Sequence, residues 1–233
     1  MTLVSLIITI TAFTFLIGLC IGSFLNVVIL RTLSNESVVL PRSKCPECQT
    51  PLKWYHNIPL LSYLYLEGKC AFCKKEISVQ YPLIELLTGV LFVALTLKYG
   101  VNVNTLFMLI FSSVFIVIAM TDLKQKIIFD SHAYILVAFG LIFNLINFGG
   151  FYYGEHVLNL GLFSVTIQHS FIESIFGVLI GVVVMEVLAR LGYLFAGVRA
   201  FGEGDTYIAA GLGAIWGWQL WLPVLFFAFV IQI

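Results

Sequence analysis

The segment Phe201-Gly202-Glu203-Gly204-Asp205 leads directly into the apolar, small-residue run Thr206-Tyr207-Ile208-Ala209-Ala210-Gly211. An ionised side chain deep in a bilayer costs about 2.5–3.5 kcal/mol, so a carboxylate at the edge of such a helix needs a reason. The glycines beside it allow backbone geometries and close approaches that other residues forbid, which would let an extended chain lie next to Asp205. The segment therefore predicts a membrane helix that begins at a candidate catalytic carboxylate.

The composition of the whole chain is that of an integral membrane protein. Of 233 residues, 61% are hydrophobic and only 10% are charged, whereas soluble domains carry about 25% charged residues. The mean hydropathy is +1.04. Apolar runs recur at the length of about 20 residues that crosses a bilayer, and they lack the period-two alternation of barrel strands. The sequence thus predicts an all-α, polytopic transmembrane helical bundle.

Seven spans are predicted, and they divide the chain into three parts. The first span has no Lys or Arg before Arg31, so it is interpreted as a retained helix and not as a secretory signal. The parts are a first transmembrane helix (1–31), a cysteine-rich loop (32–80) and the remaining bundle (81–233). Because the final span ends without a polar tail, we expect the chain to stop short of its natural C-terminus. The spans are Leu3–Leu30, Tyr81–Leu97, Thr105–Thr121, His132–Phe148, His169–Ala189, Thr206–Trp218 and Gln219–Ile233.

The distribution of basic residues predicts the orientation of these spans. If the N-terminus lies outside, eleven of the twelve Lys and Arg residues fall on the inner side and only Lys98 falls outside. This asymmetry is typical of cytoplasmic loops. We therefore expect the 32–80 loop, Asp122 and Asp205 at the cytoplasmic face. The formal net charge of zero argues against nucleic acid as a partner.

The loop between the first two spans carries two CxxC pairs, Cys45/Cys48 and Cys70/Cys73, separated by 21 residues. Each CxxC turn points both sulfurs to one side, so the two pairs supply four thiolates for tetrahedral zinc. Two disulfides are the competing interpretation, but disulfides rarely persist in the reducing cytosol. Four cysteines leave no open coordination position, so the zinc would be structural. The aromatic stretch between the pairs, residues 54–66, would pack on this site or lie at the membrane interface.

A second candidate acid, Asp122, ends the third span at the face that also receives Asp205. Two neighbouring carboxylates cannot both ionise cheaply, so one keeps a proton while the other stays charged. An aspartic protease uses this arrangement: the ionised acid activates water and the protonated acid polarises the scissile carbonyl. From its position alone, a solvated helix end explains Asp122 at least as well. Asp130 is interpreted as the N-cap of the fourth span.

Other polar and small residues have structural interpretations. Glu85, inside the second span, is expected to face the bundle interior. Glu186 and Arg190 are spaced to pair along one helix. Cys20 is interpreted as a small packing residue within the first span. The glycines at 177, 181, 211 and 213 allow close helix contacts, within the chain or between copies.

Taken together, the motifs resemble those of the type IV prepilin peptidases, bacterial membrane aspartic proteases of the GxGD type. The likeness covers nearly the whole chain. Beyond the aspartate motif at 122–130 and Gly202–Asp205, it is carried by Gly22-Ser23-Phe24-Leu25-Asn26, Pro41-Arg42-Ser43-Lys44-Cys45-Pro46, Asn57-Ile58-Pro59-Leu60-Leu61-Ser62-Tyr63 and Tyr81-Pro82-Leu83-Ile84-Glu85-Leu86-Leu87-Thr88.

The resemblance implies Asp122 and Asp205 as the catalytic pair and the four loop cysteines as the zinc-type cysteines of bifunctional members. It implies an enzyme of the bacterial inner membrane that cuts prepilins or pseudopilins after the glycine ending their basic leader. Methylation of the new N-terminal residue, usually Phe, from S-adenosylmethionine would follow. No glycine fingerprint for that cofactor is present, so the methyl donor rests on the resemblance alone. The chain departs from the family pattern at Phe129, where Pro is usual, and at Thr206-Tyr207, where an apolar residue and Lys are usual.

Three alternatives to the bifunctional enzyme remain at this point. The first is a non-enzymatic scaffold of a secretion or pilus apparatus, with the zinc loop as a docking element. The second is a peptidase without methyltransferase activity. The third, a proton-relay transporter, is less favoured because both acids sit at one face and not along a crossing path. The sequence predicts no particular oligomeric state.

Overall fold

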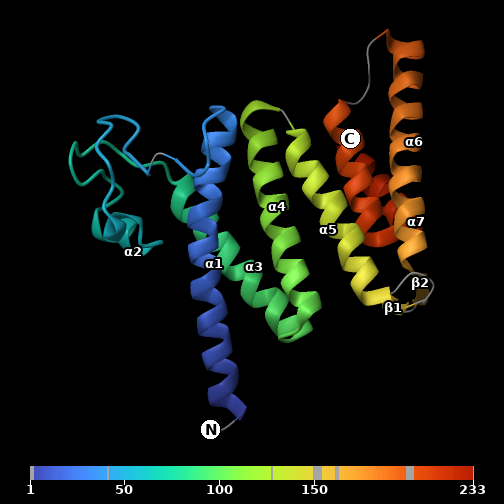
Figure 1. Ribbon diagram of the computed structural model, residues 1–233, viewed down its shortest axis with the longest axis horizontal. Helices are drawn as coiled ribbons and strands as arrows, with labels where there is room; N and C mark the ends of the chain where they lie inside the picture. Colours follow the sequence, from blue (N-terminus) through green and yellow to red (C-terminus); the bar gives the residue numbers. More distant parts are fainter. Residues whose placement is uncertain are drawn as a thin grey trace. The chain divides into compact units, whose positions relative to one another are not determined.

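The computed structural model describes residues 3–40, 42–126, 128–148, 154–160, 163–197 and 202–232. The chain forms two compact units, Met1–Lys126 and Ile127–Ile233. Both are built from long helices (Figure 1). Each unit is described by itself below.

The first unit packs three long helices, α1 (Leu3–Leu33), α3 (Gln80–Tyr99) and α4 (Val103–Gln125). Leu25 and Ile29 of α1 meet Ile84 of α3 and residues 116–117 of α4 in a buried apolar core. The backbones of α1 and α3 approach closely at Gly22, where an added Cβ would lie 2.7 Å from the Cα of Glu85. Small residues at such positions are what allow membrane helices to pack without a hydrophobic driving force.

The cysteine-rich loop connects α1 to α3 and contains two short helices. They are the 3₁₀ helix η1 (Trp54–Asn57) and the single-turn helix α2 (Leu61–Tyr65). The side chain of Asn26 in α1 donates to the carbonyl of Tyr81 at 3.1 Å and accepts from the Gln80 amide at 3.4 Å. These bonds hold the start of α3 against α1. The N-terminal end of α3, where the loop ends, therefore lies beside α1, from which the loop begins.

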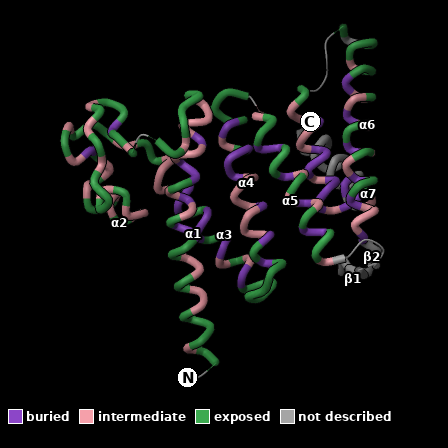
Figure 2. Tube along the Cα trace, viewed as in Figure 1, coloured by how far each residue is buried: buried purple, intermediate pink, exposed green. Residues whose placement is uncertain are grey.

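The second unit contains α5 (Asp130–Phe148), α6 (Phe171–Ala196) and α7 (Glu203–Gln232). Helix α7 packs on both α5 and α6. Buried Asn144 of α5 donates to the carbonyls of Ala214 and Ile215 at 2.8 and 3.2 Å, which joins α5 to α7. On the other side, Met185 of α6 packs with Ala209 and fully buried Trp221 of α7. In both units the buried residues lie on the helix faces that meet their neighbours (Figure 2).

A β-hairpin links α5 to α6 and adds to the predicted helical architecture. Strand β1 (Gly154–Leu160) pairs antiparallel with β2 (Phe163–His169), so that Gly154 lies opposite His169 and Leu160 opposite Phe163. The sequence analysis left most of this segment as a connection and began the fifth span at His169. Helix α6 begins instead at Phe171, after Ser170, whose hydroxyl accepts the N–H of Glu173 at 3.2 Å. Ser170 is thus the N-cap of α6.

The predicted membrane spans agree closely with the helices. Within the described residues, α1, α3, α4, α5 and α6 are long and apolar enough to cross a bilayer. The all-helical membrane bundle is therefore confirmed. The last two predicted spans both fall on α7, which leaves helical geometry at Gly217 (φ 69°, ψ 176°), next to the predicted boundary after Trp218.

Two smaller predictions are wrong in detail. Cys20 is exposed on α1 and does not pack in the interior of its unit. Asp130 is the first residue of α5 and not the N-cap residue that precedes it. The difference is one position, and an acid in the first helical turn still interacts favourably with the helix dipole.

Candidate active-site residues and metal centre

Asp122 lies in the last turn of α4 and is exposed in its unit. The helix ends four residues later because Lys126 adopts a left-handed conformation (φ 53°, ψ 38°), and its N–H donates to the Asp122 carbonyl at 2.7 Å. Thr121 beside it is fully buried and donates its hydroxyl to the Ile118 carbonyl at 3.0 Å. The buried Thr121 and the left-handed cap therefore hold Asp122 on a well-defined last turn of α4, where it is exposed.

Asp205 lies in the first turn of α7 and is half-buried. Its Oδ2 accepts the backbone N–H of Gly202, the residue before the helix, at 2.9 Å. This bond is the acid-to-backbone half of a capping box, in which the third helical residue reaches back to the N-cap. The helix N-terminus also stabilises a negative charge through its dipole. The carboxylate of Asp205 is thus held in place through Oδ2, while Oδ1 has no hydrogen-bond partner among the described residues.

The two glycines of the Gly202–Asp205 motif have different roles. A Cβ on Gly204 would lie 2.6 Å from the Cβ of Ile128, so only glycine allows this turn of α7 to pack against the residues that precede α5. A Cβ on Gly202 would meet only Asp205 Oδ2, at 3.5 Å. We expected both glycines to make room for a foreign chain. In the structure, the chain's own Ile128 occupies the space at Gly204, whereas at Gly202 the described residues leave room beside Asp205.

Thr206 and Tyr207, where the sequence departs from the family pattern, make contacts at the start of α7, together with Tyr134, which the sequence analysis did not single out. The rings of Tyr134 on α5 and Tyr207 on α7 lie 5.4 Å apart. Thr206, next to Asp205, is buried, and its hydroxyl has no hydrogen-bond partner in the described part of the chain. The only sequence signal for this seam was that α7 departs from the family pattern at Thr206-Tyr207, which the structure shows to be contact positions.

The four loop cysteines come together as predicted. Their Sγ atoms all lie within 4.8 Å of one another, and the Cys45 and Cys73 sulfurs are 3.9 Å apart. Tetrahedral coordination with Zn–S bonds of about 2.3 Å requires sulfurs about 3.8 Å apart. Cys45 and Cys70 are buried, whereas Cys48 and Cys73 are partly exposed. The donor set and its spacing fit a closed, four-coordinate metal site.

The two CxxC turns repeat the same backbone geometry. The N–H of Gln49 donates to the Cys45 carbonyl at 2.9 Å, and the N–H of Lys74 donates to the Cys70 carbonyl at 3.1 Å. Gln49 and Lys74 both have positive φ, 55° and 59°. Such a conformation is uncommon outside glycine and persists only where surrounding contacts support it. The same left-handed conformation at the residue after each CxxC pair is typical of two matching metal-binding turns, here called knuckles.

Electrostatics within the cluster favour a bound cation. Hydrogen bonds from the Thr50 side chain and backbone lower the pKa of Cys48 to about 6, and the backbone N–H groups of Cys73 and Phe72 lower the pKa of Cys70. For Cys73 the Lys75 N–H favours the thiolate, but desolvation and the neighbouring thiols raise its pKa to about 11. Cys48 and Cys70 therefore lose their protons readily, whereas Cys73 keeps its proton because a further negative charge beside the other thiols is unfavourable. A divalent metal removes that resistance, since coordination deprotonates a thiol outright.

Glu85 connects the cysteine-rich loop to the membrane helices. It is buried in α3, as the sequence predicted, and its Oε2 accepts the backbone N–H of Leu60 at 2.8 Å. Leu60, the N-cap residue before α2, has φ 58°, an unfavourable value for a branched side chain. The sequence could not reveal this partner because the bond joins residues 25 positions apart. The predicted pair of Glu186 and Arg190 also forms, at 3.0 Å on the exposed surface of α6.

Comparison with known proteins places these residues in a family context. Residues 16–99, with the four cysteines, match the bacterial peptidase A24 N-terminal domain, and residues 109–233, with both aspartates, match the type IV leader peptidase family. A prepilin leader peptidase/N-methyltransferase of Myxococcus xanthus is 37% identical over 93% of this chain and 59% of its own length.

Two further relatives carry the same name. That of Neisseria gonorrhoeae is 36% identical over 91% of this chain and 75% of its own length. That of Klebsiella pneumoniae is 34% identical over 89% of this chain and 86% of its own length. The chain thus spans between about three-fifths and six-sevenths of these relatives. No solved structure matches significantly.

Proposed function

Because the chain belongs to the type IV leader peptidase family, we propose that it is an intramembrane aspartic endopeptidase that removes the basic leader from prepilins or pseudopilins. The cut follows the glycine that ends the leader, and methylation of the new N-terminal residue from S-adenosylmethionine follows the cut. The observation that carries the proposal is that the family match includes both candidate aspartates while relatives of this name cover about nine-tenths of the chain.

The chemistry assigned to the aspartates is hydrolysis by an acid pair. We assign the general base to Asp205, because the α7 N-terminus and the Gly202 N–H stabilise its charge. The base removes a proton from water, the water oxygen bonds to the scissile carbonyl carbon, and a protonated Asp122 donates a hydrogen bond to the carbonyl oxygen. The tetrahedral intermediate then loses its C–N bond as the leaving amine gains a proton. One acid of this pair comes from each unit, and their pairing is part of the proposal.

We assign structural zinc to the cysteine cluster. Cys45, Cys48, Cys70 and Cys73 would hold the ion, and four thiolates leave no position at which it could activate water. The ion would supply folding free energy to a loop that has few buried apolar residues of its own. The N-methyltransferase part of the proposal is supported by the names of the relatives.

The proposed orientation places the N-terminus outside and the cysteine-rich loop and both aspartates at the cytoplasmic face. The support is the asymmetry of Lys and Arg residues about the helices that are apolar enough to span. A substrate with a basic leader and an apolar helix would then present its cleavage site at the same face. The scaffold alternative is not favoured, because the named relatives are enzymes. A peptidase that lacks methyltransferase activity remains the second candidate.

The proposal is tested by Asp122→Asn and Asp205→Asn in purified protein incubated with a prepilin in detergent or liposomes. Each change preserves side-chain shape and removes the acid, so we expect leader removal to slow by about 10²–10⁴-fold. Glu186→Gln removes an exposed carboxylate of α6 and serves as the control, with an unchanged rate expected. Leader removal at the wild-type rate by either aspartate variant would refute the two-acid mechanism. Mass spectrometry of the cleaved product tests methylation separately.

A further inference from the structure

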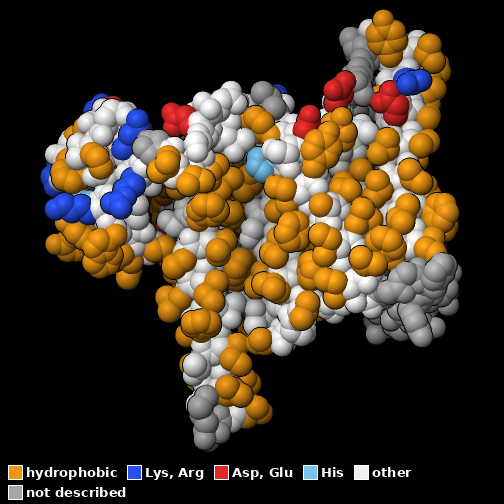
Figure 3. Space-filling model, in the orientation of Figure 1, with side chains coloured by type: hydrophobic (Ala, Val, Ile, Leu, Met, Phe, Trp, Pro, Cys, Tyr) orange, Lys and Arg blue, Asp and Glu red, His pale blue; other side chains and the backbone are white. Residues whose placement is uncertain are grey.

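Four large side chains of the cysteine-rich loop project from its surface. Trp54 of η1 is 80% exposed, and Leu61, Leu64 and Tyr65 of α2 are 66%, 71% and 87% exposed. The two short helices contact each other, so these side chains belong to one part of the loop, here called the Trp54 face. Hydrophobic side chains gather on this side of the loop, away from most of its Lys and Arg residues (Figure 3). A soluble loop would not leave such a cluster in water.

The Trp54 face lies at the depth of the membrane helices and not beyond their ends. Its anchor is the bond from the Leu60 N–H to Glu85, which stands five positions after the first residue of α3. At 1.5 Å per residue, this places Leu60 about 7 Å inside the start of that span. Glu85 also packs against Gly22, eleven positions before the end of α1, or about 16 Å along that helix.

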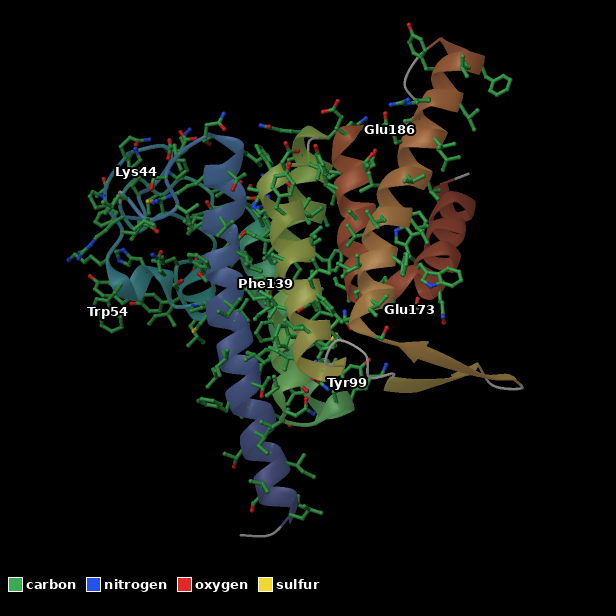
Figure 4. The ribbon with its side chains drawn as sticks, turned by 45° about the vertical axis from the view of Figure 1, so that its right-hand side comes forward. Lys44, Trp54, Tyr99, Phe139, Glu173 and Glu186 are labelled. Atoms are coloured by element: carbon green, nitrogen blue, oxygen red, sulfur yellow. The ribbon has the colours of Figure 1, made fainter. Side chains whose placement is uncertain are left out.

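The pictures agree with this depth. Figure 1 and Figure 4 differ by a rotation about the vertical axis, and in both the lower part of the loop lies level with the body of α1. Figure 4 labels Lys44 and Trp54 at opposite ends of the loop, with Lys44 near the C-terminal end of α1 and Trp54 level with its middle part. The charged end of the loop is thus the end farther from the membrane core.

We propose that the Trp54 face inserts into the lipid headgroup and acyl boundary of the adjoining leaflet, so that the cysteine-rich loop is a membrane-embedded element. Counted along α3, Leu60 lies about 7 Å in, which is within the 5–10 Å to which interfacial helices bury their apolar faces; counted along the longer α1, it lies deeper. Trp and Tyr are the residues enriched at this level, where an apolar ring and a polar edge are both satisfied. This proposal concerns the loop alone and does not depend on the proposed peptidase activity.

The charges of the loop favour anionic lipid as the occupant. Lys53 directly precedes Trp54, and its Nζ is 5.7 Å from the centre of the Tyr55 ring, so a cationic group stands at the edge of the Trp54 face. Between residues 32 and 80 there are six Lys or Arg residues and four Glu residues. Four thiolates with one zinc ion would carry a charge of −2 and balance this excess, so the attraction to anionic headgroups rests on Lys53 beside the Trp54 face.

Backbone N–H groups of the Trp54 face have hydrogen-bond partners within the protein. An unpaired N–H in a bilayer is costly, so irregular chain at that depth must find internal partners. The N–H groups of Leu61 and Leu64 donate to the carbonyls of Pro59 and Leu60 at 2.6 and 3.0 Å. Glu85 accepts the Leu60 N–H. This accounts for the buried carboxyl in α3, which pairs with the inserted loop.

The test measures the environment of Trp54 in full-length protein reconstituted into liposomes that contain anionic lipid. The Trp54 signal is the difference between the emission of the wild type and that of Trp54→Phe. We expect lipids brominated near the acyl carbonyl to reduce this emission strongly, and aqueous iodide to reduce it only weakly. The matched control is Lys44→Trp in the Trp54→Phe background, which puts a tryptophan at the charged end of the same loop and should show the reverse pattern.

Two results would overturn the proposal. Strong quenching of Trp54 by iodide without quenching by brominated lipid would place the face in water. Shielding from both quenchers would mean that protein covers the face, either another part of the chain or a second copy. Leu64→Asp adds a measurement that does not use fluorescence: if the face is inserted, dansyl-labelled anionic lipid will lose contact with the loop, seen as lower energy transfer from Trp54.

Discussion

Glu85 shows what a single residue does in this chain. Its hydropathy context predicted only that it faces the interior, and the structure supplies its partner, the N–H of Leu60. The bond ties the cysteine-rich loop to α3 at a depth where water is scarce. The buried acid of α3 is therefore the acceptor that holds Leu60 of the loop.

Replacing Glu85 tests this role. Glu85→Ala leaves the Leu60 N–H without its acceptor, so we expect a loss of about 1–3 kcal/mol in stability. Glu85→Gln keeps a carbonyl oxygen at the same place and should lose much less. Thermal unfolding of the purified variants in one detergent compares them. Equal destabilisation by Ala and Gln would show that the charge, and not the hydrogen bond, is what matters.

The candidate aspartates differ in how far the sequence explains them. The motif identified Asp205, and the structure adds that its Oδ2 accepts the Gly202 N–H, which fixes the side chain at the start of α7. The same motif suggested that both glycines make room for a substrate. Contact of Gly204 with Ile128 shows that one of them is needed for packing within the chain. Spacing along the sequence could not distinguish these two reasons for a glycine.

At the scale of the helices, close packing depends on small residues that face one another. Gly177 of α6 and Gly213 of α7 approach so closely that a Cβ on either would overlap the carbonyl of the other, and a Cβ on Gly181 would lie 2.8 Å from the Ala209 carbonyl. The sequence left open whether these glycines serve contacts within the chain or between copies. In this unit they serve the contact of α6 with α7.

We expect Gly213→Ala to weaken the second unit by about 1–3 kcal/mol, because an added methyl group must push α6 away from α7. Gly202→Ala is the stability control, since its Cβ would meet nothing closer than 3.5 Å. Lower thermal stability for Gly213→Ala alone, measured in the same detergent, is the expected result. Equal unfolding temperatures for the two variants would show that the contact of Gly213 with Gly177 does not contribute to stability.

The elements themselves were largely predictable because hydropathy is a local property. The five helices that are long and apolar enough to span correspond to the first five predicted spans. The end of one predicted span and the start of the next also located the break at Gly217. The β1–β2 hairpin escaped prediction although β2 carries a period-two signal, since Phe163, Val165 and Ile167 alternate with polar residues, whereas β1 has no such alternation. Strand pairing depends on register between two segments, which neither segment specifies alone.

At the scale of the whole molecule, the cysteine cluster is the feature that joins folding to metal binding. Its four sulfurs hold together two knuckles that share few buried apolar contacts, and the exposed Lys75–Glu47 pair between them, at 3.6 Å, is worth little in water. Metal should therefore provide much of the stability of the loop while leaving the long helices independent of it.

Metal removal tests this division. We expect purified protein to contain zinc in a one-to-one ratio with the chain, and a strong chelator to expose residues 42–80 to proteolysis while the helices stay resistant. Cys45→Ser should lose the metal, whereas Cys20→Ser should keep it because Cys20 lies outside the cluster. Metal analysis and mapping of the cleavage sites give the answer. Wild-type protein that contains no metal would contradict the assignment.

By itself, the sequence determined that this chain is a bundle of membrane helices, that two CxxC pairs are candidate metal ligands, and that its candidate acids stand at helix ends. Hydropathy, ligand spacing and motif order are carried by neighbouring residues, so they can be seen without a fold. Only the tertiary structure decided that Ile128 fills the space at Gly204, that Glu85 holds Leu60 and that the cysteine-rich loop lies beside its membrane helices. Those contacts join distant residues, and packing alone selects which of them meet.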